Sequence, residues 1–434
     1  MNRIPKINYP YARQTVWLAL WLILVGIMLP AGATADDQTD QPEQVQAEDN
    51  SEDEKEQDYL EWYLVDRVRD ERENKVPLFE QDWGGELEFR YTELKPTGEA
   101  AERDRDLGMS LWYELETRSD WELHFGLNTR RASRPKTNWV AADDAFEEDW
   151  PFAEEYWVKK TWSGDDSEFV VQAGRFTYPF DISQILIDND LLMRGGYLEY
   201  ELDAEDRGSL ERVRFSVLGT ELLSAKSELD AAQLVAARAA LRWAAGDDGQ
   251  IDIALSYLDF IHAKAIQRAV LAEEWRIGGV TGGGETTNFI DSETGELVSD
   301  YTIADLWWRV SLLEDADWPV KLEFELAKNL GAAGEGAGCD SAYYAELACG
   351  RRGDSGDLEL SLDHAVVEAD AALAAVNRGE YASNYNGTRL QARYTIAENL
   401  ELRSAYTWST SLAAREPDFA FDNEEVNVYL TYSW

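Results

Sequence analysis

The chain has 434 residues and carries 85 acidic against 40 basic side chains, which gives a net charge of −45 at pH 7. This charge excludes nucleic acid as an expected partner, because a phosphate backbone would be repelled. A mean hydropathy of −0.45 excludes several apolar membrane helices, and an aromatic content of 12% excludes a wholly disordered acidic chain.

The first 35 residues have the pattern of a secretory signal peptide. Three basic residues precede an apolar run over 16–29, and the small residues Ala33 and Ala35 follow it. An uncleaved anchor helix is the less favoured alternative, because the run is shorter than a bilayer span. We therefore expect export, with a mature protein that begins near Asp36.

The next segments are too polar to form a core of their own. Residues 36–58 hold many acids against the single base Lys55, which predicts an acidic disordered tail. Metal binding by this tail is a weaker alternative, because the spacing matches no ligand loop. Apolar residues at helical spacing then predict a short periplasmic helix and linker over 59–81, with Pro77 ending the helix.

From residue 82 to the end, apolar and polar residues alternate. In the first such segment Leu87, Phe89 and Tyr91 share one face, while Glu86 and Glu88 lie on the other. This period of two marks strands with one apolar and one polar face. The predicted strands are 82–94, 105–117, 119–130, 153–162, 167–175, 193–202, 210–220, 234–243, 249–260, 302–313, 317–328, 341–351, 357–367, 387–396, 400–410 and 424–434.

The connections alternate between short turns and long loops rich in Gly and Asp. The strands are about ten residues long, the length of a tilted strand that crosses a bilayer. We therefore predict an all-β fold over 82–434: a transmembrane antiparallel β-barrel of 16 strands with short periplasmic turns and long extracellular loops. A soluble β-sandwich is the alternative, but it would not need an export signal, an aromatic chain terminus and the regular alternation of long and short connections together.

The strand over 341–351 decides both the strand count and the state of the cysteines. Fifteen strands follow directly from alternation, and 341–351 supplies the one that makes the number even. Cys339 and Cys349 are about 33 Å apart if this segment is extended, whereas a disulfide needs Cα atoms within about 7 Å. They can pair only if the segment folds back as a loop.

If the apolar face meets lipid, the charged face lines a water-filled lumen. The candidate pore-lining or constriction residues are Glu86, Glu88, Glu114, Glu116, Asp181, Asp188, Asp190, Arg212, Arg214, Arg238, Arg242, Arg389, Arg393 and Arg403. Their clustering by sign predicts acidic and basic walls that face each other and select hydrated solutes. We expect the apolar loop over 176–192 to fold inward and bring its acids towards the arginines. The alternative is that these are solvated faces with no role in selectivity.

An ordered set of segments resembles the bacterial outer-membrane porin family. The segments are GRFTYPFDISQILIDNDLLMRGGYLEY (174–200), AAQLVAARAALRW (231–243), SYLDF (256–260), DYTIADLWWRVSL (300–312), WPVKLEFELAKN (318–329) and LSLDHAVVEADAAL (360–373). The resemblance covers roughly 82–434 and implies a porin barrel in the outer membrane of a Gram-negative bacterium. The solute is not implied, and alginate-export channels are a second family of similar style.

The expected partners follow from this assignment. They are outer-membrane lipid and lipopolysaccharide, small hydrophilic solutes, a homotrimeric assembly of the chain, and the barrel assembly machinery through the C-terminal strand ending in Trp434. We expect passive diffusion of small hydrophilic solutes or ions, with a polysaccharide exporter of the alginate type as the alternative.

Catalytic and cofactor motifs are not evident in the sequence. We predict no cofactor, no metal and no enzymatic activity. A barrel phospholipase would need a Ser activated by one of three histidines, and His124 has no evident partner. The acidic pairs Glu86/Glu88 and Glu114/Glu116 resemble a glycosidase dyad only in spacing, and solvated wall residues are the simpler interpretation.

Overall fold

The computed structural model describes most of the region that alternates in sequence. The described residues are 79–96, 101–117, 119–128, 140–141, 152–180, 185–187, 191–204, 209–223, 232–246, 248–266, 276–277, 280–281, 288–291, 294, 296–374, 376–377, 381–412 and 422–434. All of them belong to one compact unit, Val76–Trp434. The expected signal peptide, acidic tail and short helix lie outside the described residues, and strand structure begins at Phe79, inside the predicted linker.

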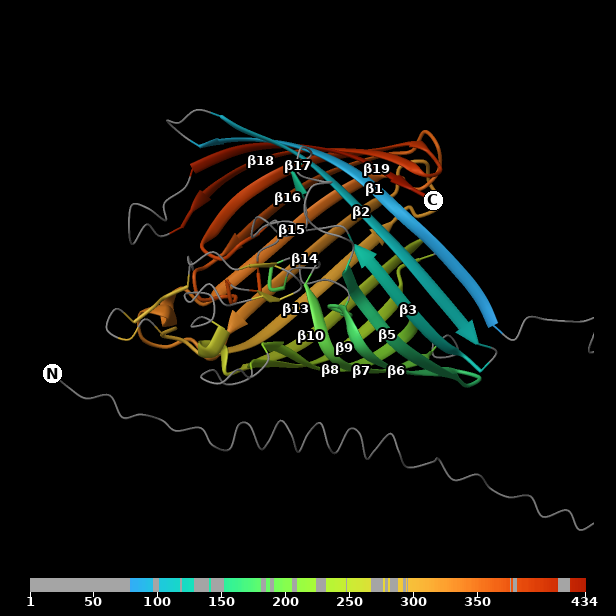
Figure 1. Cartoon of the computed structure of the whole chain (residues 1–434), viewed down its shortest axis with the longest axis horizontal. Helices are drawn as coiled ribbons and strands as arrows, with labels where there is room; N and C mark the ends of the chain where they lie inside the picture. Colours follow the sequence, from blue (N-terminus) through green and yellow to red (C-terminus); the bar gives the residue numbers. More distant parts are fainter. Residues whose placement is uncertain are drawn as a thin grey trace, which may run out of the picture. The chain divides into compact units, whose positions relative to one another are not determined.

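Sixteen strands form the wall of a barrel, which Figure 1 shows from the side. They are β1 (Phe79–Pro96), β2 (Glu102–Thr117), β3 (Trp121–Asn128), β5 (Phe152–Ser163), β6 (Ser167–Thr177), β7 (Leu192–Asp203), β8 (Leu210–Leu223), β9 (Ala232–Ala244), β10 (Gly249–Ile261), β13 (Tyr301–Leu312), β14 (Val320–Asn329), β15 (Ser341–Gly350), β16 (Leu358–Val367), β17 (Tyr385–Ala397), β18 (Leu400–Ser411) and β19 (Asp422–Ser433). The short strand β4 (Val140–Ala141) pairs with β2, and β11 (Arg276–Ile277) pairs with β12 (Val280–Thr281) in a separate hairpin.

The barrel is closed because its first and last strands pair with each other. Each wall strand pairs antiparallel with its neighbours along the chain, and β1 pairs with both β2 and β19. At the seam, Gly85 N–H donates to the Trp434 carbonyl at 3.1 Å, and Trp434 N–H donates back to the Gly85 carbonyl at 3.0 Å. The predicted fold class and the sixteen-strand count are therefore confirmed.

The segment that decided the strand count is a strand. Residues 341–351 correspond to β15, which pairs with β14 and β16 along its whole length. Cys349 lies within this extended strand and Cys339 precedes it, and both cysteines are free. The extended backbone separates them, so the alternative in which the segment folds back to form a disulfide is wrong.

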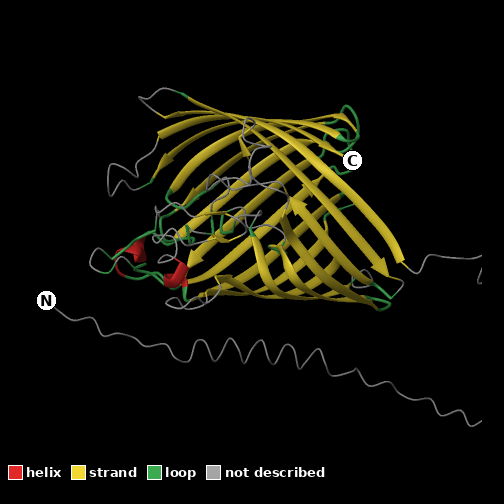
Figure 2. Cartoon of the chain, viewed as in Figure 1, coloured by secondary structure: helices red, strands yellow, loops and turns green. Residues whose placement is uncertain are grey.

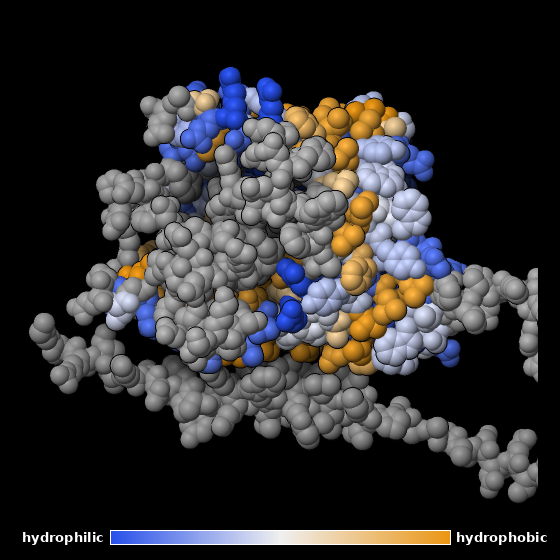
Figure 3. All heavy atoms as spheres, in the orientation of Figure 1, coloured by the Kyte–Doolittle hydropathy of each residue, from blue (hydrophilic) through white to orange (hydrophobic). Residues whose placement is uncertain are grey.

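Alternation along each strand places apolar side chains on the outside of the barrel. Leu255, Leu390 and Phe125 are 60%, 52% and 51% exposed, although they lie in the middle of strands. In the face shown in Figure 3, apolar side chains gather over the strands at the right of the view. So much exposed apolar surface is typical of a barrel that is surrounded by lipid. Among the described residues, no helix is both long enough and apolar enough to span a membrane.

The two ends of the barrel differ. Turns such as 164–166 and 398–399 are short, whereas connections at the opposite end, such as 330–340, are long, as Figure 2 shows. At the long-loop end the interior is apolar: Ile185–Ile187 and Ala371–Leu373 fold inward and are at most 2% exposed. Inward wall residues such as Leu218, Leu234 and Leu258 pack in the same cluster. Charged side chains therefore do not line the whole interior, because at this end the inward-folded loops bury part of the inner wall.

The buried Asp370, in the loop after β16, connects that loop to the loop before β13 and to the end of β14. Asp370 accepts hydrogen bonds from Phe289 N–H at 2.9 Å, Ser299 Oγ at 2.5 Å and Tyr301 Oη at 3.1 Å. Asn329 Nδ2 donates to the Asp370 carbonyl at 2.9 Å. A buried carboxylate is stable only when hydrogen bonds replace its water, so this network fixes the loops relative to one another.

Substitution of an outward residue by arginine tests which face meets lipid. Leu390→Arg, in the middle of β17, should lower the free energy of unfolding in phospholipid vesicles by about 2–4 kcal/mol, because it places a charge near the bilayer midplane. Ile396→Arg is the matched control near the end of the same strand and face, and should cost only about 0–1 kcal/mol. Equal losses from the two variants, measured by guanidinium denaturation, would show that this face does not meet lipid.

Candidate functional site

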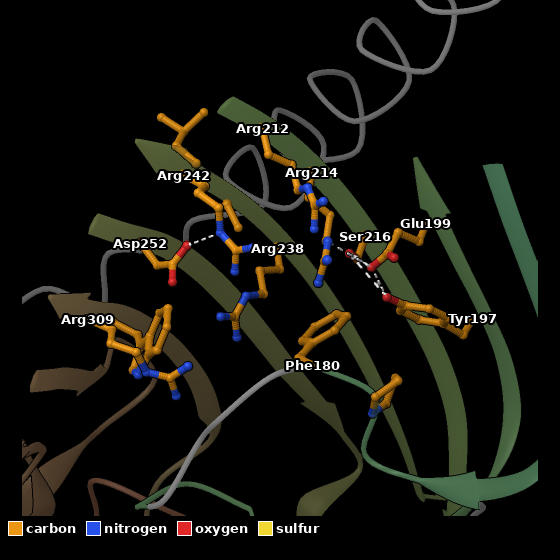
Figure 4. A pocket seen from close by; sticks show the side chains of 14 residues that line it. Phe180, Tyr197, Glu199, Arg212, Arg214, Ser216, Arg238, Arg242, Asp252 and Arg309 are labelled. Atoms are coloured by element: carbon orange, nitrogen blue, oxygen red, sulfur yellow. Dashed lines mark hydrogen bonds and ion pairs between the residues drawn. The ribbon is translucent and has the colours of Figure 1, made fainter. Parts of the chain in front are cut away.

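Five arginines surround one hollow on the inner wall of the barrel. Arg212 and Arg214 come from β8, Arg238 and Arg242 from β9, and Arg309 from β13. In Figure 4 their guanidinium groups point into the same space, with Arg309 reaching it from the opposite side. The cavity volume is about 50 Å³. Four of these arginines were predicted to line the pore, and the structure brings them together at neighbouring positions.

Most of these arginines have a carboxylate partner on an adjacent strand. Arg212 Nε lies 3.0 Å from Glu201, and an Nη atom of Arg214 lies 2.7 Å from the same residue. Arg242 Nε lies 2.7 Å from Asp252. Directly opposed residues on paired strands have Cβ atoms about 5 Å apart, which allows such contacts.

Arg309 also has a carboxylate partner on an adjacent strand, because one of its Nη atoms lies 2.9 Å from Glu323 on β14. Positive and negative side chains therefore alternate around this part of the wall. Sequence analysis expected a basic wall that faces a separate acidic wall. Around the arginine cluster, charge is instead balanced within the wall itself, because side chains reach their nearest neighbours on the next strand.

Aromatic rings complete the arginine cluster. The Trp307 indole is 3% exposed, and the guanidinium carbons of Arg238 and Arg309 lie 5.4 and 4.9 Å from its ring centroid. Cations over an indole face are attracted to its electron-rich ring. Phe180, from the loop after β6, lines the same pocket and lies beside the Arg214 and Arg238 side chains in Figure 4.

A second set of predicted residues lies on β17 and β18. Arg389 Nε lies 2.9 Å from the buried Asp363 carboxylate, to which Tyr381 also donates a hydrogen bond. Burial raises the pKa of the Tyr381 phenol, so it stays protonated as a donor. The guanidinium of Arg403 lies 3.8 Å from the Tyr429 ring centroid.

Arg393, the remaining predicted arginine of β17, has polar contacts on both sides. Its Nε donates to Gln391 at 2.8 Å, and its Nη1 lies 3.8 Å from Glu359 on β16. This set is separate in sequence and strand position from the five-arginine cluster. In this set, too, neighbouring side chains compensate the positive charge of the arginines.

The predicted acidic residues lie on β1 and β2. Glu88 accepts a hydrogen bond from Thr431 at 2.8 Å, and Glu114 lies 2.9 Å from His124 Nδ1. The sequence shows no evident partner for His124, and this prediction is wrong, because His124 contacts Glu114. Its ring also stacks on that of Trp157, with 4.9 Å between the ring centroids. The partner was missed because β3 meets β2 and β5 only in the folded sheet.

Strand alternation places the two other acidic candidates on the inner face. Glu86 and Glu116 lie on the face opposite the exposed Leu87 and Tyr113. Both are consistent with the inner wall. Their role in permeation stays a prediction.

The three predicted loop acids, Asp181, Asp188 and Asp190, lie outside the described residues. The structure does describe Ile185–Ile187, which lie in the same loop and are buried. Asn377 Nδ2 donates a hydrogen bond to the Ile185 carbonyl at 2.8 Å. The described part of this loop therefore packs inside the barrel. The placement of its acids near the arginines stays a prediction.

Sequence analysis missed several residues of the cluster. They are Phe180, Glu199, Glu201, Asp252, Trp307, Arg309 and Glu323. A signal for some of them was present, because the apolar set of β13 places Trp307 and Arg309 on the opposite, inward face. Within the described part of the chain, no group of three or more His, Cys, Asp or Glu side chains is arranged to hold a metal ion.

Comparisons with known proteins found similarity in solved structures alone. No protein-family model matches the chain, and no curated protein sequence matches it. Among solved structures, Salmonella typhi OmpF in complex with daunomycin matches at a TM-score of 0.48 and 10% identity, over 82% of this chain and 97% of that chain. An anion-selective porin from Comamonas acidovorans matches at a TM-score of 0.48 and 11% identity, over 82% and 100% of the two chains.

A third match is a loop-deletion mutant of OmpT, an outer membrane protein of Vibrio cholerae. It has a TM-score of 0.46 and 9% identity, over 82% of this chain and 100% of that chain. The barrel assignment depends on the strand pairing described above and not on these similarities.

Reversal of two charges in the cluster tests whether it faces the conducting path. The double variant Arg238→Glu/Arg242→Glu should raise the cation-to-anion permeability ratio by roughly twofold or more, because the local potential changes by at least the order of kT. The measurement is the reversal potential of a planar bilayer under a KCl gradient. Arg175→Glu/Arg194→Glu, the same charge change on outward positions of β6 and β7, is the matched control. An unchanged reversal potential in the first variant would place these arginines outside the path.

Proposed function

We propose that the chain is a porin of the Gram-negative outer membrane, a water-filled channel for passive diffusion of small hydrophilic solutes or ions. The observation that carries this proposal is a closed barrel with exposed apolar side chains outside and charged side chains inside. Apolar surface of this extent is unfavourable in water, and charges are unfavourable in a dry interior. Lipid outside and water inside satisfy both requirements.

A transport role fits the interior better than catalysis does. His124 lies on the inward face of β3, and its partners are Glu114 at 2.9 Å and Glu155 at 3.8 Å. A hydrolase of the barrel type would instead place a serine hydroxyl against the imidazole. We therefore propose no enzymatic activity and no bound cofactor.

The proposal also includes the pore-lining residues, the partners and the assembly that the sequence predicts. The predicted glutamates and arginines would line the pore, and Asp181, Asp188 and Asp190 would narrow it from the inward loop. The barrel would contact outer-membrane lipid and lipopolysaccharide, assemble through its C-terminal strand with the barrel assembly machinery, and form a homotrimer.

A channel specific for an anionic polymer, as in alginate export, is the second candidate. The five arginines around one hollow favour it, because guanidinium groups bind carboxylates in a bidentate manner. The carboxylate partners of these arginines weigh against it, because they already compensate much of the positive charge. We therefore favour a diffusion porin.

Conductance of the purified chain in a planar bilayer tests the proposed function. We expect open, ohmic current steps in KCl that a panel of neutral sugars and polyuronate leaves unblocked. Block by polyuronate would favour the specific exporter. Lipid hydrolysis without any conductance would contradict both, and a heat-denatured sample controls for currents from contaminants.

The mature N-terminus tests the proposed export. Expression with a Gram-negative secretion system should yield a chain that begins near Asp36, because Ala33 and Ala35 form the predicted cleavage site. Intact-mass measurement of the membrane-extracted protein checks this. Retention of residues 1–35 would contradict a cleaved signal, and Ala35→Arg should block processing as the control.

A further inference from the structure

A strand edge lies open next to the seam, at the short-turn end of the barrel. β1 pairs with β2 from Phe79 onward, whereas on its other side pairing begins only at Gly85, opposite Trp434. In Figure 1 the start of β1, in blue, continues past the C-terminus together with the end of β2. Within the described part of the chain, Phe79–Gly84 therefore has a strand partner on one side alone. We call its other side the open edge.

The strand register shows which backbone groups point to the open edge. Gly85 exchanges two hydrogen bonds with Trp434, so the N–H and C=O groups of odd-numbered residues in β1 point away from β2. Those of Gln81 and Trp83 point the same way and meet no other strand among the described residues. The Trp83 N–H donates instead to Oδ1 of Asp82 at 2.8 Å. A local side chain thus takes the place of a neighbouring strand.

The open edge is accessible to solvent. Trp83 is 68% exposed, more than any other large apolar side chain of the described residues, and Gln81 and Asp82 are also exposed. An edge with unpaired backbone groups is unstable in hydrocarbon, because nothing there replaces the missing hydrogen bonds. The open edge therefore lies in water beyond the short turns, on the side that is periplasmic in the proposed porin.

An exposed edge of this kind is a template for an extended peptide. A peptide that aligns with β1 gains main-chain hydrogen bonds with Gln81 and Trp83 and continues the sheet in line with β19. Its residues opposite Gln81 and Trp83 lie on the outer face of the sheet. Its residues opposite Glu80 and Asp82 lie on the inner face. The two faces can therefore select different side chains.

The side chains of the edge favour a peptide that alternates basic and apolar residues. Glu80 lies directly opposite Glu116 on β2, and neither has a basic partner among the described residues. Like charges that face each other across two strands are destabilising, so a cation beside them is stabilising. On the outer face, the exposed Trp83 ring offers apolar contact.

A second copy of the chain in the same membrane does not fit this edge. Strands in such barrels are tilted by about 35–45°. Two copies related by an axis along the membrane normal would bring their β1 edges together at roughly twice this angle, and strands that cross so steeply do not form a ladder. The occupant is therefore a separate extended peptide.

We propose that the open edge of β1 binds an extended basic segment of a periplasmic protein by strand addition. The proposal rests on the proposed function, because an outer-membrane porin places this edge in the periplasm. The segment lies antiparallel to β1, next to Trp434, and exchanges main-chain hydrogen bonds with Gln81 and Trp83. Its basic side chains point towards Glu80, and its apolar side chains pack beside the Trp83 ring.

Binding of a fluorescent peptide to the full chain in phospholipid nanodiscs tests the site. The probe is a short peptide of alternating Lys and Val, and the measurement is fluorescence anisotropy. We expect saturable binding that weakens as salt is added, because part of the attraction is between exposed charges. The same peptide N-methylated at its valines keeps every charge but cannot donate to β1, and should bind about tenfold more weakly. A peptide of alternating Glu and Val should not bind.

Substitution of Gln81 provides a matched pair of variants. Gln81→Pro removes an N–H that points to the open edge and leaves the ladder with β2 intact, as prolines in edge strands do. It should weaken binding of the probe by about tenfold. Gln81→Ala keeps the N–H and should keep the affinity of the unmodified chain. The N-methylated peptide tests the same hydrogen bonds without any change to the protein.

The outcomes separate this inference from the proposed function. Absence of single-channel current in the unmodified chain overturns the channel, whereas normal current without saturable peptide binding overturns the docking site alone. The site is also overturned if either control peptide binds as well as the probe, or if Gln81→Pro retains full affinity. A dimer of the unmodified chain that Gln81→Pro dissociates would assign the edge to a second copy and overturn the peptide site.

Discussion

The pairing of the first strand with the last is the constraint on which the rest of the structure depends. In a membrane, each backbone N–H and C=O must find a partner within the sheet, and an open edge would leave a whole row unpaired. The reciprocal hydrogen bonds between Gly85 and Trp434 close this edge. Once the ring is closed, every strand has a defined inside and outside, and alternation assigns each side chain to one of them.

Closure also determines how the interior carries charge. A charge on the inner wall lies close to residues of two adjacent strands, so compensation is local. Arg242 with Asp252 and Arg309 with Glu323 are examples from β9 to β14. Such pairs leave the arginines ordered and hold their guanidinium groups towards the lumen. A transverse field across the pore is correspondingly weaker than segregated walls of opposite sign would produce.

The arginine cluster lies where two kinds of interior meet. Towards the long loops, Ile185–Ile187 and Leu218 form a dry apolar cluster. Towards the short turns, the wall carries paired charges, and Trp307 lies between these regions with its indole buried. The apolar loops thus reduce the water around the nearby guanidinium groups, which strengthens their interaction with any anion that reaches them.

Alternation along the chain was enough to predict the sixteen wall strands, their order and their two faces, because a period of two is a local property that each strand carries. It also supplied the inward position of residues such as Arg238 and Arg242. The contacts between strands could be seen only in the folded barrel: Arg242 pairs with Asp252, His124 contacts Glu114, and Trp307 lies between arginines. These contacts depend on strand register and on inward folding of the loops, and alternation within one strand specifies neither.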